Sequence, residues 1–354
     1  MPEDIYEALA RHLDEMPVGA PMSDELMGIL RILFTPEEAE MGAKLPFMNA
    51  DLDALSGMTS VPAGELRGIL DGMVAKGTVF RSTKGEVAKY RLLPTVVGFS
   101  ETPFWPGQDS ERVRKLAPLW NEYFKTAFGK EIGDRKTPLL RVVPVEEEIA
   151  SESQVLPFET VRQLVEEVDF RAVAYCPCRQ IKAYVGEGCE HERENCFHFG
   201  SMGRHIVEQG MGRELTLQET LEKLKEAHEE GLVFSTDNYA GKVSTICCCC
   251  GCCCGFIQTR NELGYLNALS ASSYAARVDE ESCVGCGDCE ERCPVNAIEL
   301  GDGETAAVDE ARCLGCGVCI PTCSGEALSL QRRGDAAEIL PLTGFVAAQL
   351  QEKS

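Results

Sequence analysis

The sequence predicts an α+β chain with several domains, and three observations support this prediction. The chain has 354 residues, the length of two or three ordinary domains. Apolar residues follow helical spacing through the first third of the chain and then give way to two strand-like segments. Near the C-terminal end, one cysteine pattern occurs twice in succession, and short apolar strand-like segments flank each copy.

The N-terminal segment is predicted to be helical. Apolar residues lie at helical spacing in two stretches, at residues 5–13 and 26–33. A third helix is expected to begin after Thr35 and to continue to about Leu45. Thr35 and Glu38 have the spacing of an N-cap residue and its capping glutamate, which satisfy each other's backbone N–H groups.

Residues 50–93 are predicted to follow the order helix, turn, helix, hairpin, with Lys84-Gly85 as the hairpin turn. The helices are expected at residues 51–56 and 62–76, and the two strands of the hairpin at 78–81 and 87–92. This order resembles a winged helix. The charges of the second helix cancel, whereas the hairpin is mildly basic. DNA binding, protein docking and scaffolding all remain open as roles, because a fold alone does not specify a function.

The stretch that follows is predicted to be an α/β connector to the upstream cysteines. Helices are expected at residues 111–127 and 158–168, and strands at 139–145 and 172–175. A further helix, capped by Thr216, is expected at residues 217–230. The first of these helices carries Trp120, Tyr123 and Phe124. We expect these aromatic side chains to belong to the core and assign them no functional role.

The composition narrows the classes of function. The formal net charge is −23, which disfavours a nucleic-acid partner because phosphate backbones would be repelled. An acidic surface suits docking onto a basic redox partner, although it also suits a merely soluble protein. The N-terminus has no apolar signal core and no stretch is long enough to span a membrane. With 19 cysteines arranged in metal-type runs, a reducing cytoplasm is the expected location.

The two copies of the cysteine pattern lie between Arg277 and Leu330 and are offset by 30 residues. Each copy is a C-x2-C-x2-C-x3-C run, formed by Cys283, Cys286, Cys289 and Cys293 and then by Cys313, Cys316, Cys319 and Cys323. A cubane iron–sulfur cluster needs four thiolates, and the fourth cysteine of such a run ligates the other cluster. The intervening glycines permit positive φ angles and bring backbone N–H groups close to the sulfurs.

This stretch resembles a bacterial two-cluster [4Fe-4S] ferredoxin domain. The resemblance implies a ferredoxin-like fold and two ligand sets, Cys283, Cys286, Cys289 with Cys323 and Cys313, Cys316, Cys319 with Cys293. The proline that usually follows the fourth cysteine is present as Pro294, but Ser324 replaces it in the second run. A zinc site or buried apolar thiols are the alternatives, although zinc sites do not use four cysteines per run, twice.

Eleven further cysteines lie upstream in two sets. The first set is Cys176, Cys178, Cys189 and Cys196, and the second is Cys247, Cys248, Cys249, Cys250, Cys252, Cys253 and Cys254. Thiols packed so densely have no rationale in packing, so we expect at least one further iron–sulfur site. The first set has enough ligands for one cubane, and the second set either completes that site or holds another. Adjacent cysteines on a strand point to opposite faces and share a cluster only in a tight turn.

The arrangement also resembles a group of multi-domain ferredoxin-like proteins of anaerobic bacteria, which share the CxCR and CCGxCCG-like segments. In that comparison Cys248 and Cys252 are extras, with doubtful ligand status. A similarity to the non-cubane cluster motif of heterodisulfide-reductase-type proteins is weak. His191 and His198 are candidate iron ligands or polar neighbours, and Arg179 is expected either to donate to cluster sulfur or to form a surface salt bridge.

These observations predict four regions: a winged-helix-like domain at residues 1–98, a cysteine-rich α/β domain at 99–270, a dicluster domain at 271–332 and a tail or helix at 333–354. No dinucleotide, P-loop or radical-SAM motif is present. The leading hypothesis is an electron-transfer protein that serves a partner oxidoreductase. The alternatives are an oxidoreductase with a reactive cluster at residues 247–254, which reduces a disulfide or small acceptor, and a redox-sensing DNA-binding regulator.

Overall fold

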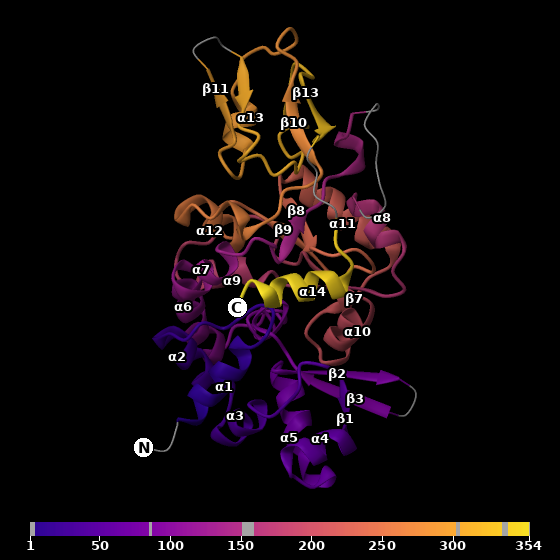
Figure 1. Cartoon of the computed structure of the whole chain (residues 1–354). Helices are drawn as coiled ribbons and strands as arrows, with labels where there is room; N and C mark the ends of the chain where they lie inside the picture. Colours follow the sequence, from indigo (N-terminus) through magenta and orange to yellow (C-terminus); the bar gives the residue numbers. More distant parts are fainter. Residues whose placement is uncertain (1–3, 85–86, 151–158, 302–304, 335–338, 354) are drawn as a thin grey trace.

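The structure is a computed structural model of the chain (Figure 1). It describes residues 4–84, 87–150, 159–301, 305–334 and 339–353. Helices and strands are mixed along the whole chain, which confirms the predicted α+β class. In Figure 1 the N-terminal helices form one end of the molecule and the duplicated cysteine pattern forms the other.

The N-terminal third packs helices against a small antiparallel sheet of strand order β1-β3-β2. The helices are α1 (Ile5–Asp14), α2 (Asp24–Leu33), α3 (Pro36–Gly42), α4 (Leu52–Thr59) and α5 (Ala63–Lys76). The strands are β1 (Ala50–Asp51), β2 (Val79–Lys84) and β3 (Val87–Leu92). The expected hairpin is therefore present, and Gly85 of its expected turn lies outside the described residues.

Helix α3 has the predicted start but ends earlier than expected. Thr35 and Glu38 form the capping box at its first turn. The helix ends at Gly42, because the next N–H groups, those of Lys44 and Leu45, bond to carbonyl groups three residues back instead of four. The fully buried Leu45 side chain then turns into the core.

The middle of the chain forms a six-stranded sheet in which every neighbouring pair of strands is antiparallel. Its strand order is β4-β8-β9-β6-β5-β7. The strands are β4 (Leu140–Val142), β5 (Arg171–Ala174), β6 (Cys196–Phe199), β7 (Arg213–Glu214), β8 (Val233–Asp237) and β9 (Thr245–Cys249). The two strands that carry upstream cysteines, β6 and β9, are neighbours at the centre of the sheet.

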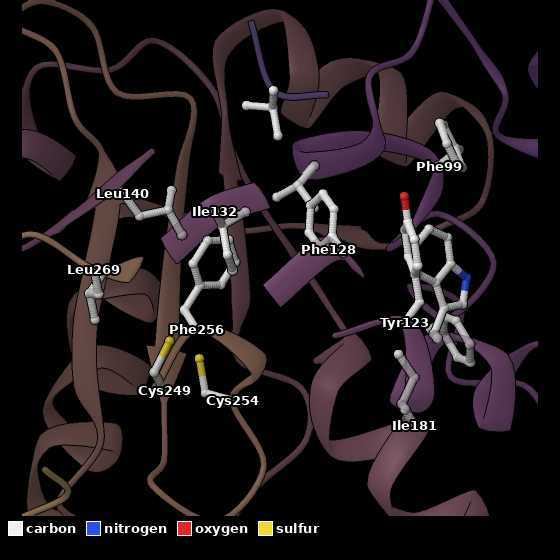
Figure 2. Close-up of a cluster of buried hydrophobic side chains, with 14 of the residues drawn as sticks. Phe99, Tyr123, Phe128, Ile132, Leu140, Ile181, Cys249, Cys254, Phe256 and Leu269 are labelled. Atoms are coloured by element: carbon white, nitrogen blue, oxygen red, sulfur yellow. The ribbon is translucent and has the colours of Figure 1, made fainter. Parts of the chain in front are cut away.

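Helices surround this sheet and connect it to the N-terminal region. They are α6 (Glu111–Lys125), α7 (Ala127–Gly133), α8 (Val161–Glu166), α9 (Pro177–Tyr184), α10 (Gly200–Glu208), α11 (Leu217–Glu229) and α12 (Gly255–Leu263). Helix α6 follows the predicted boundary at residue 98 and packs against both α2 and α9. Its Trp120 and Tyr123 are fully buried, in the core cluster that Figure 2 draws. Among the described residues, no helix is both long and apolar enough to cross a membrane.

The C-terminal part contains two small antiparallel sheets and a returning helix. Strands β10 (Tyr274–Val278) and β13 (Leu328–Arg332) form one sheet, and β11 (Ile298–Leu300) and β12 (Ala306–Val308) form the other. The short helix α13 (Asp288–Arg292) precedes β11, and α14 (Leu342–Gln351) ends the chain. The last helix returns to the middle region, where the Glu352 carboxylate accepts a 2.6 Å hydrogen bond from Thr137 Oγ1.

Gly77 terminates α5 in the left-handed region, with φ +77°. A Cβ atom at this position would lie 2.4 Å from Thr102 Cβ. We expect Gly77→Ala to lower the free energy of unfolding by about 2 kcal/mol or more, because alanine adds both strain and a steric clash. Thermal unfolding followed by circular dichroism measures this effect.

Gly68→Ala is the matched control in the same helix, because a Cβ atom there meets nothing within 4 Å. Alanine at a helical position stabilises by about 0.5–1 kcal/mol relative to glycine. The control is therefore expected to raise the melting temperature. Equal melting temperatures for the two variants would contradict this account of α5.

Candidate metal centres

The duplicated cysteine pattern forms two groups of thiols, and each group contains cysteines from both runs. Four cysteines line one cavity, Cys293, Cys313, Cys316 and Cys319. In the other group, the Cys289 thiol interacts with those of Cys286 and Cys323. In both groups, the fourth cysteine of one run lies with cysteines of the other run. Ligation of iron by these residues remains a prediction.

Backbone N–H groups point at the sulfurs in both halves of the pattern. Ala297 donates from its backbone N–H to Cys293 Sγ at 3.2 Å, and the equivalent Ala327 donates to Cys323 Sγ at the same distance. Positive φ angles allow the loops to turn this tightly at the expected glycines, Gly285, Gly287, Gly315 and Gly317. Such donors stabilise the negative charge of a cluster, so both halves suit a cubane.

The cysteines of residues 247–254 lie on a strand, in a turn and at the start of a helix, and this change of backbone separates their thiols. Strand β9 contains Cys247, Cys248 and Cys249, and because side chains alternate along a strand, Cys248 points away from the other two. Cys248 is buried in a separate apolar cluster. A turn follows, and Cys254 is the N-cap residue of α12. The chain therefore directs neighbouring cysteines to different places.

Nine of the upstream cysteines line one cavity. Six of them, whose thiols interact with one another in succession, are named here the thiol ring: Cys176, Cys178, Cys196, Cys247, Cys249 and Cys254. Strand pairing places Cys196 opposite Cys247. Side-chain interactions connect successive members in the order Cys176, Cys178, Cys254, Cys249, Cys247, Cys196. Figure 2 shows the sulfurs of Cys249 and Cys254 close together beneath Phe256.

Two helices begin at the thiol ring. Cys176 is the N-cap residue of α9, and Cys254 is the N-cap residue of α12. The backbone N–H groups of Arg179, Gly255 and Ile257 interact with ring thiols. Helix N-termini carry partial positive charge and unpaired N–H donors, so this arrangement favours an anionic group in the cavity.

The crowding of the ring thiols also fits a metal centre. The neighbouring thiol raises the pKa of Cys176, Cys247 and Cys249 well above that of a free thiol, and burial raises these values further. Without a cation the thiols therefore stay protonated. Metal ions bind thiolates and compensate their charge. The cavity has a volume of about 60 Å³, which is more space than a single ion needs.

Arg179 lies buried beside the ring, which excludes the expected alternative of a surface salt bridge. Its guanidinium donates to Asn195 Oδ1 at 2.7 Å and to the Cys248 carbonyl oxygen at 2.7 Å. Burial alone would lower the pKa of Arg179, but the thiols of Cys176 and Cys250 contribute to raising it above its ordinary value. The arginine thus supplies a fixed positive charge between these two thiols.

The two histidines occupy different surroundings. His198 is fully buried, and its Nε2 lies 3.2 Å from Cys196 Sγ. Burial lowers the pKa of His198 to about 3, so its imidazole is neutral. A neutral imidazole suits a hydrogen bond to a ligand sulfur. His191 instead interacts with Glu230, with 3.3 Å between His191 Nδ1 and Glu230 Oε2.

A second group of upstream thiols, named here the four-thiol site, consists of Cys189, Cys250, Cys252 and Cys253. All four sulfurs lie within 4.8 Å of one another. The structure therefore places Cys189 with the turn after β9 and apart from the other three members of its sequence set. Cys252, which the sequence comparison treated as an extra, belongs to this group, whereas Cys248 belongs to neither.

Sequence reasoning did not identify two polar residues that line the thiol-ring cavity, Ser100 and Glu101. The Glu101 carboxylate accepts a 2.6 Å hydrogen bond from the Gly98 backbone N–H. Burial raises the pKa of Glu101 to about 7. These residues lie in an irregular segment far from any cysteine in sequence, so no motif could have marked them.

We expect Arg179→Gln to make the reduction potential of a centre in the thiol ring more negative. A positive charge favours the reduced, more anionic state, and its removal favours the oxidised state. If the separation is taken as about 6 Å and the effective dielectric constant as about 20, one charge is worth about 3 kcal/mol, or on the order of 100 mV for one electron. A potentiometric titration followed by electron paramagnetic resonance (EPR) measures the shift.

Arg179→Lys keeps the charge and is expected to shift the potential less. Arg135→Gln removes another buried arginine, one that bonds to the Gln349 carbonyl oxygen on α14, and serves as the control. If Arg135→Gln and Arg179→Gln changed the potential equally, the proposed electrostatic role of Arg179 would be wrong. Iron content is measured for each variant, so that loss of the centre is recognised separately.

Comparison with known families gives one match. A family model described as "4Fe-4S dicluster domain" matches residues 276–330, which include both cysteine runs. Comparisons of the chain with curated proteins and with solved structures find no match. The C-terminal repeat is therefore similar to 4Fe-4S dicluster domains. Together with the clustered upstream thiols, this match supports an iron–sulfur protein.

Proposed function

We propose that the protein transfers electrons between a partner oxidoreductase and an iron–sulfur centre in its middle region. Two [4Fe-4S] clusters would occupy the C-terminal repeat, one held by Cys283, Cys286, Cys289 and Cys323, the other by Cys293, Cys313, Cys316 and Cys319. A further iron–sulfur centre would occupy the thiol ring. The ring offers six thiols, more than the four that one cubane requires.

The observation that carries this proposal is the contact between the repeat and the upstream thiols. Pro294 follows the ligand candidate Cys293, and its carbonyl oxygen accepts a 2.8 Å hydrogen bond from Asn261 Nδ2. A Cβ atom on Gly251, in the turn after β9, would lie 3.0 Å from the same oxygen. Electron tunnelling slows steeply with distance, so this contact supports a direct route between the two regions.

The other thiol group of the repeat lies at the surface, where a partner can approach. Cys286 is exposed, and the neighbouring Val284 side chain is 67% exposed. The acidic residues exposed in the same stretch of chain are Asp279, Glu280, Glu281, Asp288, Glu290 and Glu291. An acidic rim around an exposed apolar residue suits docking onto a basic face of a redox protein.

A second candidate function is reduction of a disulfide or another small acceptor at the thiol ring. It is favoured by Ser100 and Glu101, which line the cavity alongside the thiols. Cleavage of a disulfide consumes two electrons and two protons and yields two thiols. The repeat would deliver the electrons one at a time, and Glu101 would carry one proton at a time from solvent. A centre with a non-cysteine ligand or an open iron position distinguishes this function from simple relay.

The DNA-binding alternative has less support from the N-terminal region. Lys76 Nζ lies 2.7 Å from Glu38 Oε2, and Arg81 forms an ion pair with Asp71. The Arg91 guanidinium packs over the Phe80 ring, 4.6 Å from its centre. These contacts occupy basic side chains that would otherwise be available to phosphate groups.

The iron content of the anaerobically purified chain tests the proposed third centre. We expect about twelve or more irons per chain, with a similar amount of acid-labile sulfide, because two cubanes account for only about eight. The triple variant Cys196→Ser, Cys247→Ser and Cys249→Ser leaves three members of the thiol ring, fewer than one cubane requires. Its iron content is expected to fall toward about eight.

Cys248→Ala is the control, because Cys248 lies on the same strand and borders the same cavity, but its side chain packs in an apolar cluster apart from Cys249 and Cys254. Its iron content is expected to equal that of the unmodified chain. About eight irons in every form would overturn the claim of an upstream centre. Retention of all the iron in the triple variant would overturn the thiol ring as its location.

Charge reversal tests the proposed docking end. We expect the double variant Glu280→Lys and Glu281→Lys to slow reduction by a basic electron donor about tenfold at low salt and to weaken the salt dependence. Stopped-flow measurement of the second-order rate against ionic strength provides the readout. Glu37→Lys with Glu65→Lys makes the same charge change on exposed residues of α3 and α5. Equal effects in both pairs would contradict docking near Cys286.

A further inference from the structure

We propose that the four-thiol site binds a single tetrahedral metal ion, zinc or iron, separately from any iron–sulfur cluster. The site consists of Cys189, Cys250, Cys252 and Cys253. This inference goes beyond the proposed electron-transfer function, because the ion would be an additional centre. It also gives a role to Cys252, which has no place in the thiol ring.

The spacing of the sulfurs favours one ion over a cluster. All four lie within 4.8 Å of one another, and the sulfurs of Cys189 and Cys253 are 3.5 Å apart. Four thiolates about 2.3 Å from one ion form a tetrahedron with edges of about 3.8 Å. In a cubane each thiolate binds a different iron, so the four sulfurs are spread farther apart. Tetrahedral sites with four sulfur ligands are typical of zinc and iron.

The local backbone explains how adjacent cysteines can share this site. Residues 251–253 form a turn between β9 and α12, and the Cys254 N–H closes it by donating to the Cys250 carbonyl oxygen at 3.1 Å. In a turn, unlike a strand, neighbouring side chains can converge. Cys189 completes the group from the loop between α9 and β6. An ion bound here would therefore join two loops that are distant in sequence.

The charge balance is favourable for a divalent ion. Four thiolates and one divalent cation carry a net charge of −2, which is costly to bury without compensation. The buried Arg179 guanidinium lies beside the Cys250 thiol as well as the thiol of Cys176 in the ring. Cys252 is exposed, whereas Cys250 and Cys253 are buried. The ion would thus have a positively charged neighbour on its inner side and access from solvent on its outer side.

The position of the site indicates what the ion would do. The turn lies between β9, which contains the ring member Cys249, and α12, whose N-cap residue is the ring member Cys254. Its Gly251 packs against the Pro294 carbonyl oxygen. A bound ion would hold this turn in one conformation. It would therefore fix the position of the thiol ring relative to the C-terminal repeat. As zinc it would act only in this structural way, whereas as iron it could also carry an electron.

Metal analysis and X-ray absorption of the full chain test the proposal. The unmodified protein is expected to contain either one zinc per chain or one iron in excess of its acid-labile sulfide. Absorption spectra at the zinc edge are expected to show only sulfur neighbours, at about 2.3 Å. If the ion is iron, the expected result is instead a high-spin ferric EPR signal. The double variant Cys189→Ser and Cys252→Ser is expected to lose this ion and to keep its acid-labile sulfide.

Cys248→Ala is expected to retain the ion and serves as the control for substitution within the run. The dicluster EPR signal and the far-ultraviolet circular dichroism of the double variant establish that the chain still folds. Loss of acid-labile sulfide together with iron would overturn the proposal, because the site would then hold a cluster. An unchanged metal content in the double variant would also overturn it. The all-sulfur zinc coordination or the ferric EPR signal of the unmodified chain is read independently of any iron in the thiol ring.

Discussion

The close packing of thiols where strand β9 meets helix α12 is the constraint on which the rest of the structure depends. Thiols that face one another in a buried ring cannot all ionise, and the pKa of Cys176, Cys247 and Cys249 rises accordingly. Bound metal relieves this constraint, because it binds thiolates and balances their charge. The helix N-termini at Cys176 and Cys254 and the buried Arg179 act in the same direction.

The thiol groups also lie in an order that leads from the surface of the protein to its interior. One thiol group of the C-terminal repeat lies at an exposed, acidic end, and the other lies against the turn that carries Cys250–Cys253. Beyond that turn the thiol ring is enclosed by the central sheet and by α6, α9 and α12. The proposed route therefore leads from the surface into the protein. Such an arrangement suits a protein that accepts electrons from a partner at one end and stores or uses them inside.

The local features of the fold could be predicted from the sequence. The capping residues Thr35 and Thr216 begin their helices as expected, because capping depends only on neighbouring residues. Glycine spacing likewise predicted the positive φ angles at Gly315 and Gly317. The early end of α3 at Gly42 was missed, because it depends on where Leu45 is buried.

The division of the upstream thiols could not be predicted in the same way. It depends on the pairing of β6 with β9, which sets Cys196 opposite Cys247 across a long sequence separation. It also depends on the point where β9 ends and the turn begins, since this decides which of two adjacent cysteines faces the ring. The contributions of Ser100 and Glu101 depend on long-range packing too and have no local signal.

An anomalous difference map at the iron absorption edge, from crystals of anaerobically purified protein, tests the central claim most directly. The account predicts strong iron density in both thiol groups of the C-terminal repeat and a further peak inside the thiol ring, next to Cys249 and Cys254. Iron density confined to the repeat would contradict the account. The upstream thiols would then need an explanation other than electron transfer.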